Sequence, residues 1–214
     1  MGIILDNVDI WWPAFIGTLQ LFFGGGLLAL VLGFIVGAMR VSPVPIARAV
    51  GTAYVNTIRN TPLTLVFFVF AFGIPVIIDF KGYVVLAILA LGIYTATYVA
   101  ETIRSGINTV PVGQAEAARA IGLSFGQVMG FVVLPQAARS VIPPMMSVFI
   151  ALLKNTTVAA GFSVVNLGNI RNTLSERGEN AMGVLLWVAL IFVVLVLVLS
   201  FLQQRLEKKW RIAR

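Results

Sequence analysis

The chain has 214 residues, of which 59% are hydrophobic and 11% are charged, and its mean hydropathy is +1.00. Soluble domains carry about 25% charged residues, so this composition excludes an ordinary soluble protein and indicates one helical membrane domain. The sequence contains no Cys and no His, which excludes disulfides, thiol nucleophiles, and metal sites or acid–base chemistry that depend on His.

The formal net charge is +7. In a protein with several spans, Lys and Arg collect on the cytoplasmic side of the membrane, and no soluble basic patch or nucleic-acid module is visible. We therefore expect no nucleic-acid partner. Residues 1–12 contain two Asp but no Lys or Arg, so the positively charged region that begins a signal peptide is absent.

The charge-free runs predict five membrane spans, since a spanning helix needs about 20 residues. The spans are expected at about 14–39, 63–78, 83–100, from 139 with an interruption around 152–157, and 183–202. Residues 46–58 follow two prolines and predict a short helix lying at the membrane interface.

A sixth span over residues 120–138 is the alternative, because this segment is also charge-free. It is much less apolar than the other runs, and charge favours five spans. With five spans and the N-terminus outside, 11 basic residues lie inside and 4 lie outside, in line with the positive-inside tendency. We therefore expect an all-α membrane protein with five transmembrane helices, an external N-terminus and a cytoplasmic C-terminus.

The acidic residues limit the chemistry. None of the eight lies in the middle of a clean span, whereas proton- and ion-coupled carriers usually need ionisable groups there. The sequence has no GxxxxGK[ST] loop, so the chain cannot bind and hydrolyse ATP by that route. We expect that the chain alone is not an enzyme and binds no cofactor or metal.

The segment 113–136, "GQAEAARAIGLSFGQVMGFVVLPQ", is expected between the third and fourth spans. Pro111 and Gly113 precede it, and Gln114 to Ile121 predicts a short Ala-rich helix. Gly122 predicts a left-handed cap that ends this helix. Two interpretations remain open on these grounds: a smooth helix that enters a groove of a partner, and an interfacial helix with no partner.

The letters of this segment resemble the EAA motif of bacterial ABC importer permeases. Glu116, Ala117 and Ala118 are followed at the family's spacing by Gly122 and by "VVLP" (132–135), with Val132 in place of Ile. The flanking "AETIRSGINTV" (100–110), "LLKNTT" (152–157) and "RNTPLTLV" (59–66) are similar to the polar-amino-acid branch, although Asn60 replaces the branch's Gly. The resemblance covers roughly 15–205 and is nearest to permeases of actinobacterial glutamate importers.

The resemblance implies a type I ABC importer permease fold in the membrane of a bacterial cell. It implies a single transmembrane domain over 1–214, with its core at 14–205 and a cytoplasmic coupling loop at about 104–136. The residues that it assigns to ATPase coupling are Glu116, Ala117, Ala118, Gly122, Leu134 and Pro135. The implied partners are a dimer of cytoplasmic ATPase subunits carrying ATP and Mg, a second permease subunit (related or identical) and an extracytoplasmic binding protein.

The interruption of the fourth span supplies a candidate substrate path of Lys154, Asn155, Thr156 and Thr157. Lys154 lies 15 residues beyond Arg139, or roughly 22 Å along a helix, and a Lys at such depth usually faces a cavity or snorkels. It could attract an acidic substrate, or it could be a structural residue near the outer surface. We expect Arg59 to anchor the cytoplasmic end of the second span.

The sequence thus predicts the membrane-spanning subunit of an ATP-driven importer for a polar amino acid, with glutamate as the expected substrate. Another substrate, such as glutamine, aspartate or arginine, is an alternative. From other classes, a stand-alone carrier or channel and a scaffold that anchors an ATPase remain alternatives. Residues 166–180 carry no predicted role.

Overall fold

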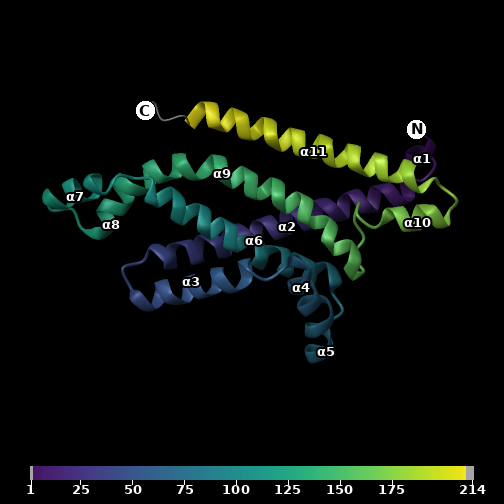
Figure 1. Ribbon diagram of the computed structural model, residues 1–214, viewed down its shortest axis with the longest axis horizontal. Coiled ribbons are helices and arrows are strands. Elements are labelled where there is room, and N and C mark those ends of the chain that lie inside the picture. The colour runs from purple at the N-terminus through teal and green to yellow at the C-terminus, as the bar shows by residue number, and fades with distance from the viewer. Residues whose placement is uncertain (1, 211–214) are drawn as a thin grey trace.

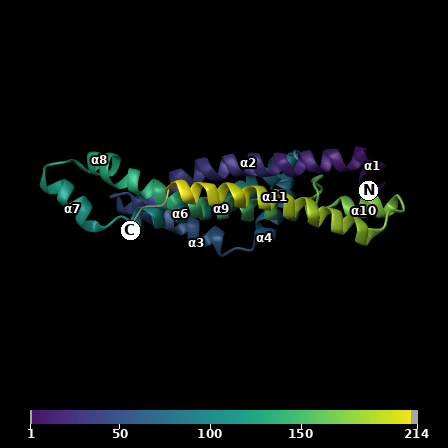
Figure 2. The same ribbon diagram turned by 90° about the horizontal axis from the view of Figure 1, so that it is seen from above.

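The structure, a computed structural model, describes residues 2–210 as a bundle of long helices with short helices at both ends (Figure 1). The segments are α1 (Gly2–Leu5), α2 (Val8–Val41), α3 (Pro45–Arg59), α4 (Leu63–Phe68), η1 (Val69–Gly73), α5 (Ile74–Ile78), α6 (Tyr83–Asn108), α7 (Val112–Ala120), α8 (Phe125–Gln127), η2 (Val128–Val133), α9 (Leu134–Asn155), η3 (Thr156–Phe162), α10 (Ile170–Glu176) and α11 (Ala181–Trp210). Segments η1 and η2 are π-helical, and η3 is a 3₁₀ helix. Helices α7 and α8 lie at one end of the bundle, and α1 and α10 lie at the other (Figure 1 and Figure 2); we call these the α7 end and the α10 end.

The described residues contain four helical stretches that are long and apolar enough to cross a membrane, and a bent pair that could form a fifth span. The four are Val8–Val41, Tyr83–Asn108, Phe125–Phe162 and Ala181–Lys208, and the pair is Pro45–Arg59 with Leu63–Ile78, bent by 98°. This confirms the all-α class and agrees with five spans. The segment 120–138 is not a sixth span, because from Phe125 onwards it forms one helical stretch with α9.

Glycines allow α2 and α6 to pack closely along their length. A Cβ atom added to Gly33 would collide with the side chain of Val99, and one added to Gly37 would lie 3.2 Å from Ile103. Gly92 on α6 is equally confined by a side chain of α2. Small residues let helix backbones approach in this way in membranes, where association depends on van der Waals packing.

The main core lies where α2, α6 and α9 meet. Leu21, Leu91 and Leu152 come from these three helices and are completely buried. The segment after α9 closes this core, because the ring of Phe162 stacks on Phe67 of α4 with centroids 5.1 Å apart. The interrupted fourth span is therefore held in place at its end by α4.

Helix α3 runs alongside α2 and α6, whereas the sequence predicted a helix lying at the interface. Gly51 and Val55 are buried, and Gly51 approaches the backbone and side chains of α2 near Met39. The hydroxyl of Tyr54 donates a 2.7 Å hydrogen bond to the carbonyl of Ile93, near the middle of α6. The end of α3 therefore reaches the middle of α6, and the chain bends by 98° between α3 and residues 63–78, the second predicted span.

A return segment, residues 163–169, leads from η3 back to the α10 end. Ser163 turns the chain with a φ of 60°, and the Leu167 amide donates a 3.0 Å hydrogen bond to the hydroxyl of Thr18 on α2. Gly17 is required beside it, because a Cβ there would collide with the carbonyl of Val165.

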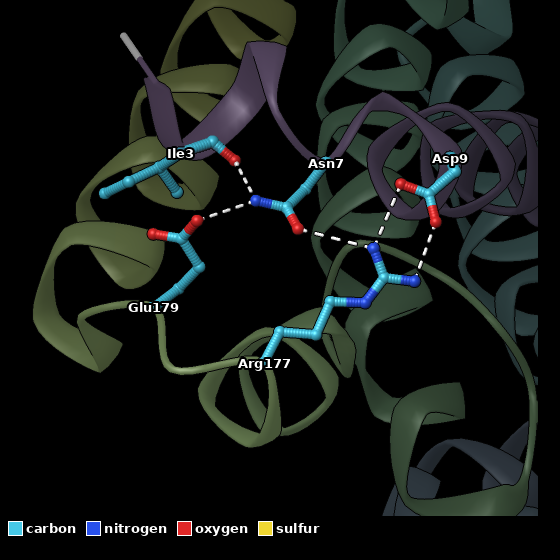
Figure 3. Close-up of polar contacts among 5 residues, drawn as sticks. All are labelled: Ile3, Asn7, Asp9, Arg177 and Glu179. Atoms are coloured by element: carbon cyan, nitrogen blue, oxygen red, sulfur yellow. Dashed lines mark hydrogen bonds and ion pairs between the residues drawn. The ribbon is translucent and has the colours of Figure 1, made fainter.

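Polar contacts join the N-terminus to the loop after α10 (Figure 3). The guanidinium of Arg177 donates hydrogen bonds of 2.7 and 3.1 Å to the carboxylate of Asp9, which raises the pKa of Arg177 above its usual value. The amide of Asn7 donates to Glu179 at 2.7 Å and to the carbonyl of Ile3 at 3.3 Å. Residues 166–180, for which no role was predicted, thus attach the start of the first span to the start of the last.

The close contact between α2 and α6 predicts that adding side-chain volume at this contact destabilises the protein. Gly33→Ala should lower the thermal denaturation temperature of the detergent-purified chain by several degrees, because overpacking of a close contact costs about 1–3 kcal/mol. Gly73→Ala is the matched control, since its added Cβ meets only Val69, at an ordinary 3.9 Å. Equal denaturation temperatures for both variants would contradict the close-packing account.

Candidate functional site

The predicted helix after Pro111 is present as α7 (Val112–Ala120), and its end has the geometry that the sequence predicted. Gly122 has a φ of +88°. Its amide donates to the carbonyl of Arg119 at 2.9 Å, and the next amide, that of Leu123, donates to the carbonyl of Ala118 at 3.2 Å. These two bonds form a Schellman motif, which satisfies the last carbonyls and ends the helix sharply.

Helix α7 is fixed to the structure that follows it. Ala118 is its buried residue and packs in a small apolar cluster with Val128 and Val133 of η2. Nearer the start of α7, the side-chain amide of Gln136 on α9 donates a 3.0 Å hydrogen bond to the side-chain oxygen of Gln114. A displacement of α7 would therefore act directly on η2 and on the start of α9.

The opposite side of α7 is exposed. Glu116, Ala117 and Arg119 are all solvent-exposed, and neither charged side chain forms an ion pair within the described part of the chain. Val112 is 71% exposed and Ile121 is 79% exposed, at an end of the bundle beyond the core. Of the three EAA residues, the first two thus face outwards and the third anchors the helix.

Leu134 and Pro135 begin α9, whereas the sequence placed them at the end of the loop segment and started the fourth span near Arg139. The helix is continuous through this point because η2 is π-helical. A proline has no amide hydrogen and its ring crowds the preceding turn, and a wider π turn just before it accommodates both effects. The same arrangement occurs at η1, which ends two residues before Pro75.

Two adjoining pockets follow the shared face of α6 and α9. The first, of about 390 Å³, is lined by Tyr94, Thr95, Tyr98, Ser147, Val148, Ala151, Leu152 and Asn155. The second, of about 310 Å³, shares Tyr98 and Val148 with it and continues past Arg59, Glu101, Thr102, Ser105, Gly106, Thr109, Ser140 and Pro144. Hydroxyl and amide groups therefore follow these two helices from Asn155 towards the α7 end.

The candidate path residues at 154–157 do not line one cavity. Asn155 faces the first pocket. Lys154 and Thr157 line a different pocket of about 430 Å³ against α11, among Phe192, Val193, Val196 and Leu197. Thr156 is completely buried, and its hydroxyl donates to the carbonyl of Leu153. Only Asn155 joins the polar face of α6.

Sequence reasoning missed Tyr94, Tyr98 and Arg59. The signal for the tyrosines was a polar stripe with helical spacing inside an apparently ordinary span, Tyr94, Thr95, Tyr98, Glu101, Thr102 and Ser105. The tyrosine hydroxyls lie 3.0 Å apart. Arg59 was expected only to anchor the end of a span; it is exposed, and its guanidinium carbon lies 5.4 Å from the centre of the Tyr98 ring.

Glu101 is the acidic residue in the lining of these two pockets, and its carboxylate is already paired with arginines. Arg104, three residues further along α6, donates to one carboxylate oxygen, and Arg40 of α2 donates to the other. The Arg40 side chain is only 9% exposed. This triad ties α2 to α6 and carries a net charge of +1.

The family model of the binding-protein-dependent transport system inner membrane component matches residues 29–212. The chain belongs to this family. It is therefore a membrane permease, and its two prominent features, the exposed α7 and the polar face of α6 and α9, belong to a transport component.

Named relatives agree on amino-acid transport but differ in substrate. The permease is 42% identical over 200 residues to the glutamate transport system permease protein GluC of Corynebacterium efficiens, covering 88% of this chain and 86% of the relative. It is 36% identical to the probable glutamine ABC transporter permease protein GlnM of Bacillus subtilis, covering 98% and 99%. A solved amino acid ABC transporter, crystallised with histidines, superposes with a TM-score of 0.90 at 26% identity over 96% of both chains.

The cap of α7 gives a testable prediction for this permease. Gly122→Val should loosen the end of α7, because a side chain in a left-handed conformation costs about 1–2 kcal/mol and β-branching adds strain. Gly122→Asn should have a smaller effect, since Asn tolerates this conformation. Hydrogen exchange of the α7 amides in nanodiscs would measure the difference; equal protection in both variants would contradict this account of the cap.

Proposed function

We propose that this permease is the membrane-spanning subunit of an ATP-driven importer for glutamate. The N-terminus and the α10 end face outwards, and the α7 end and the C-terminus lie in the cytoplasm. A dimer of ATPase subunits binds at the α7 end and carries ATP and Mg. A second permease, related or identical, completes the pathway, and an extracytoplasmic binding protein delivers the substrate.

The observation that carries the proposal is the exposed surface of α7. A nine-residue helix is marginal in isolation, yet this one is capped at its end and anchored through Ala118, while Val112 and Ile121 stand exposed beside Glu116. Apolar side chains on a polar loop indicate a surface that a partner covers. A firmly bounded helix fits a cleft on a partner.

The mechanism follows from the connection of α7 to the pathway. Closure of the ATPase dimer on ATP moves α7, which contacts η2 and is hydrogen-bonded to Gln136 near the start of α9. Helix α9 ends at Asn155 in the first pocket. The permease is then a two-state element, and ATP on another chain shifts its equilibrium between outward- and inward-facing states.

The choice of glutamate rests on the relatives. The 42% identity to a glutamate permease exceeds the 36% identity to a probable glutamine permease. Glutamine, aspartate or arginine transport is the alternative within the same machine, because both kinds of relative are close.

Charge reversal at the exposed α7 surface tests the coupling role. Glu116→Lys should reduce ATP-dependent uptake by about tenfold or more while the subunit still inserts, because a charge pair at an interface contributes roughly 1.5 kcal/mol or more. Glu176→Lys on α10 is the matched control, since it is also exposed but lies at the opposite end. Normal uptake by Glu116→Lys cells at equal membrane abundance would refute the coupling role.

Uptake of labelled glutamate in cells with and without the chain tests the substrate. The labelled substrate is competed with glutamine, aspartate, arginine and histidine, and a parallel sample is depleted of ATP. ATP-dependent uptake that only acidic amino acids compete with would support the proposal. Loss of another amino acid's uptake would retain the importer and change its substrate, and uptake that ignores ATP would overturn the mechanism.

A further inference from the structure

Arg59 is an exposed residue that ends α3, at the 98° bend between α3 and residues 63–78. Tyr54, five residues before Arg59, is hydrogen-bonded to the carbonyl of Ile93. The guanidinium of Arg59 lies over the ring of Tyr98. Both contact points are close to the middle of α6 (Tyr83–Asn108). Arg59 is therefore held against the side of α6, where it lines the second pocket.

Arg59 has no acidic partner in the described part of the chain: it takes part in none of its ion pairs and none of its side-chain hydrogen bonds. Its place in the last turn of α3 is favourable for a cation, and the Tyr98 ring adds a cation–π contact. Neither interaction provides acceptors for the five N–H groups of a guanidinium. Because Arg59 is exposed, its guanidinium is open to water or to a ligand in the pocket that it lines.

The pocket that Arg59 lines has an excess of positive charge. The only acid on its wall, Glu101, has each carboxylate oxygen occupied by an arginine. The Glu101 triad and Arg59 together therefore place a net charge of +2 beside a space of about 310 Å³. The hydroxyl of Thr102 is occupied by the carbonyl of Tyr98, and those of Tyr98 and Ser140 complete the polar lining, a surface that favours an anionic group of a small solute.

We propose that Arg59 binds a carboxylate of the amino acid as it passes along the face of α6 and α9. The planar guanidinium can hold both carboxylate oxygens at once, and Tyr98 fixes its plane from the side. This inference rests on the proposed function, because it takes an amino acid as the solute. Two carboxylates are possible sources, the α-carboxylate that every amino acid carries and the side-chain carboxylate of an acidic one.

Lys154 does not share this pocket. It lines the space against α11, where the other groups are Thr157 and apolar side chains. The chain therefore offers a matched control: a second exposed cation that lines a pocket, outside the polar face of α6.

The test uses cells that express the chain with its own partner subunits. Uptake of labelled glutamate and labelled glutamine is measured for the unaltered chain and for Arg59→Gln, Arg59→Lys and Lys154→Gln, at membrane abundance equalised by immunoblot. Arg59→Gln should reduce the maximal rate of glutamate uptake by about tenfold or more, the effect expected on losing a hydrogen bond between charged groups. Arg59→Lys should recover part of the rate, and Lys154→Gln should stay within about twofold of the unaltered chain.

The two labelled substrates distinguish the sources of the carboxylate. Loss of both uptakes in Arg59→Gln indicates the α-carboxylate, and loss of glutamate uptake alone indicates the side chain; either result supports the proposal. A rate that Arg59→Gln leaves unchanged overturns it, and so does an equal loss in Arg59→Gln and Arg59→Lys, which indicates a structural role.

The unaltered chain separates this proposal from the one on which it rests. If it promotes uptake of neither substrate, the proposed function fails and Arg59 is not the cause. If it promotes ATP-dependent uptake that Arg59→Gln does not alter, the proposed function stands and only the role of Arg59 falls.

Discussion

The close approach of α2 and α6 is the contact on which the rest of the bundle depends. Glycines on both helices remove the side chains that would separate them, and Gly33 and Gly37 leave space only for Val99 and Ile103. Helix α9 packs on the pair through Leu152, and α3 lies along both helices. Because lipid tails are as apolar as the core side chains, such shape fit replaces the hydrophobic driving force that holds a soluble core together.

The same packing places polar groups on one face of the bundle and apolar side chains on another. The hydroxyls, the amide and the paired charges lie along one face of α6 and α9, whereas α11 shows a continuous apolar surface that includes Leu186, Leu190 and Leu197. An apolar exterior suits lipid or another membrane subunit. A polar face in an otherwise apolar bundle marks the direction in which a hydrophilic solute can pass.

The sequence predicted features that depend on neighbouring residues, but not those that depend on packing between segments far apart in the chain. The presence of α7 and the left-handed Gly122 follow from short-range rules for helix caps and were predicted, although α7 begins two residues earlier and ends one residue earlier than expected. The contact of Arg59 with Tyr98 could not be predicted, because it depends on α3 lying along α2 and α6 and on the 98° bend that follows. The start of α9 was placed too late because the π turn before Pro135 keeps a helix continuous where the sequence indicated a break. Tyr94, Tyr98 and Glu101 recur with helical spacing in the sequence, but they lie within a span of ordinary hydropathy, so the polar face of α6 was not predicted.

Helix α9 has a mechanical consequence. Its 22 residues form a rod about 33 Å long, with Gln136 near one end and Asn155 at the other. Its N-terminal end is joined to α7, Met145 near its middle packs on α2 and α6, and Leu152 packs on the same helices three residues before Asn155. A push on the N-terminal arm is therefore transmitted along the helix to the packed segment between Met145 and Asn155. The stiffness of α9 between Met145 and Asn155 then sets how far the residues beside the solute move. Pro143 and Pro144 lie next to Met145, so substitutions there would change that stiffness.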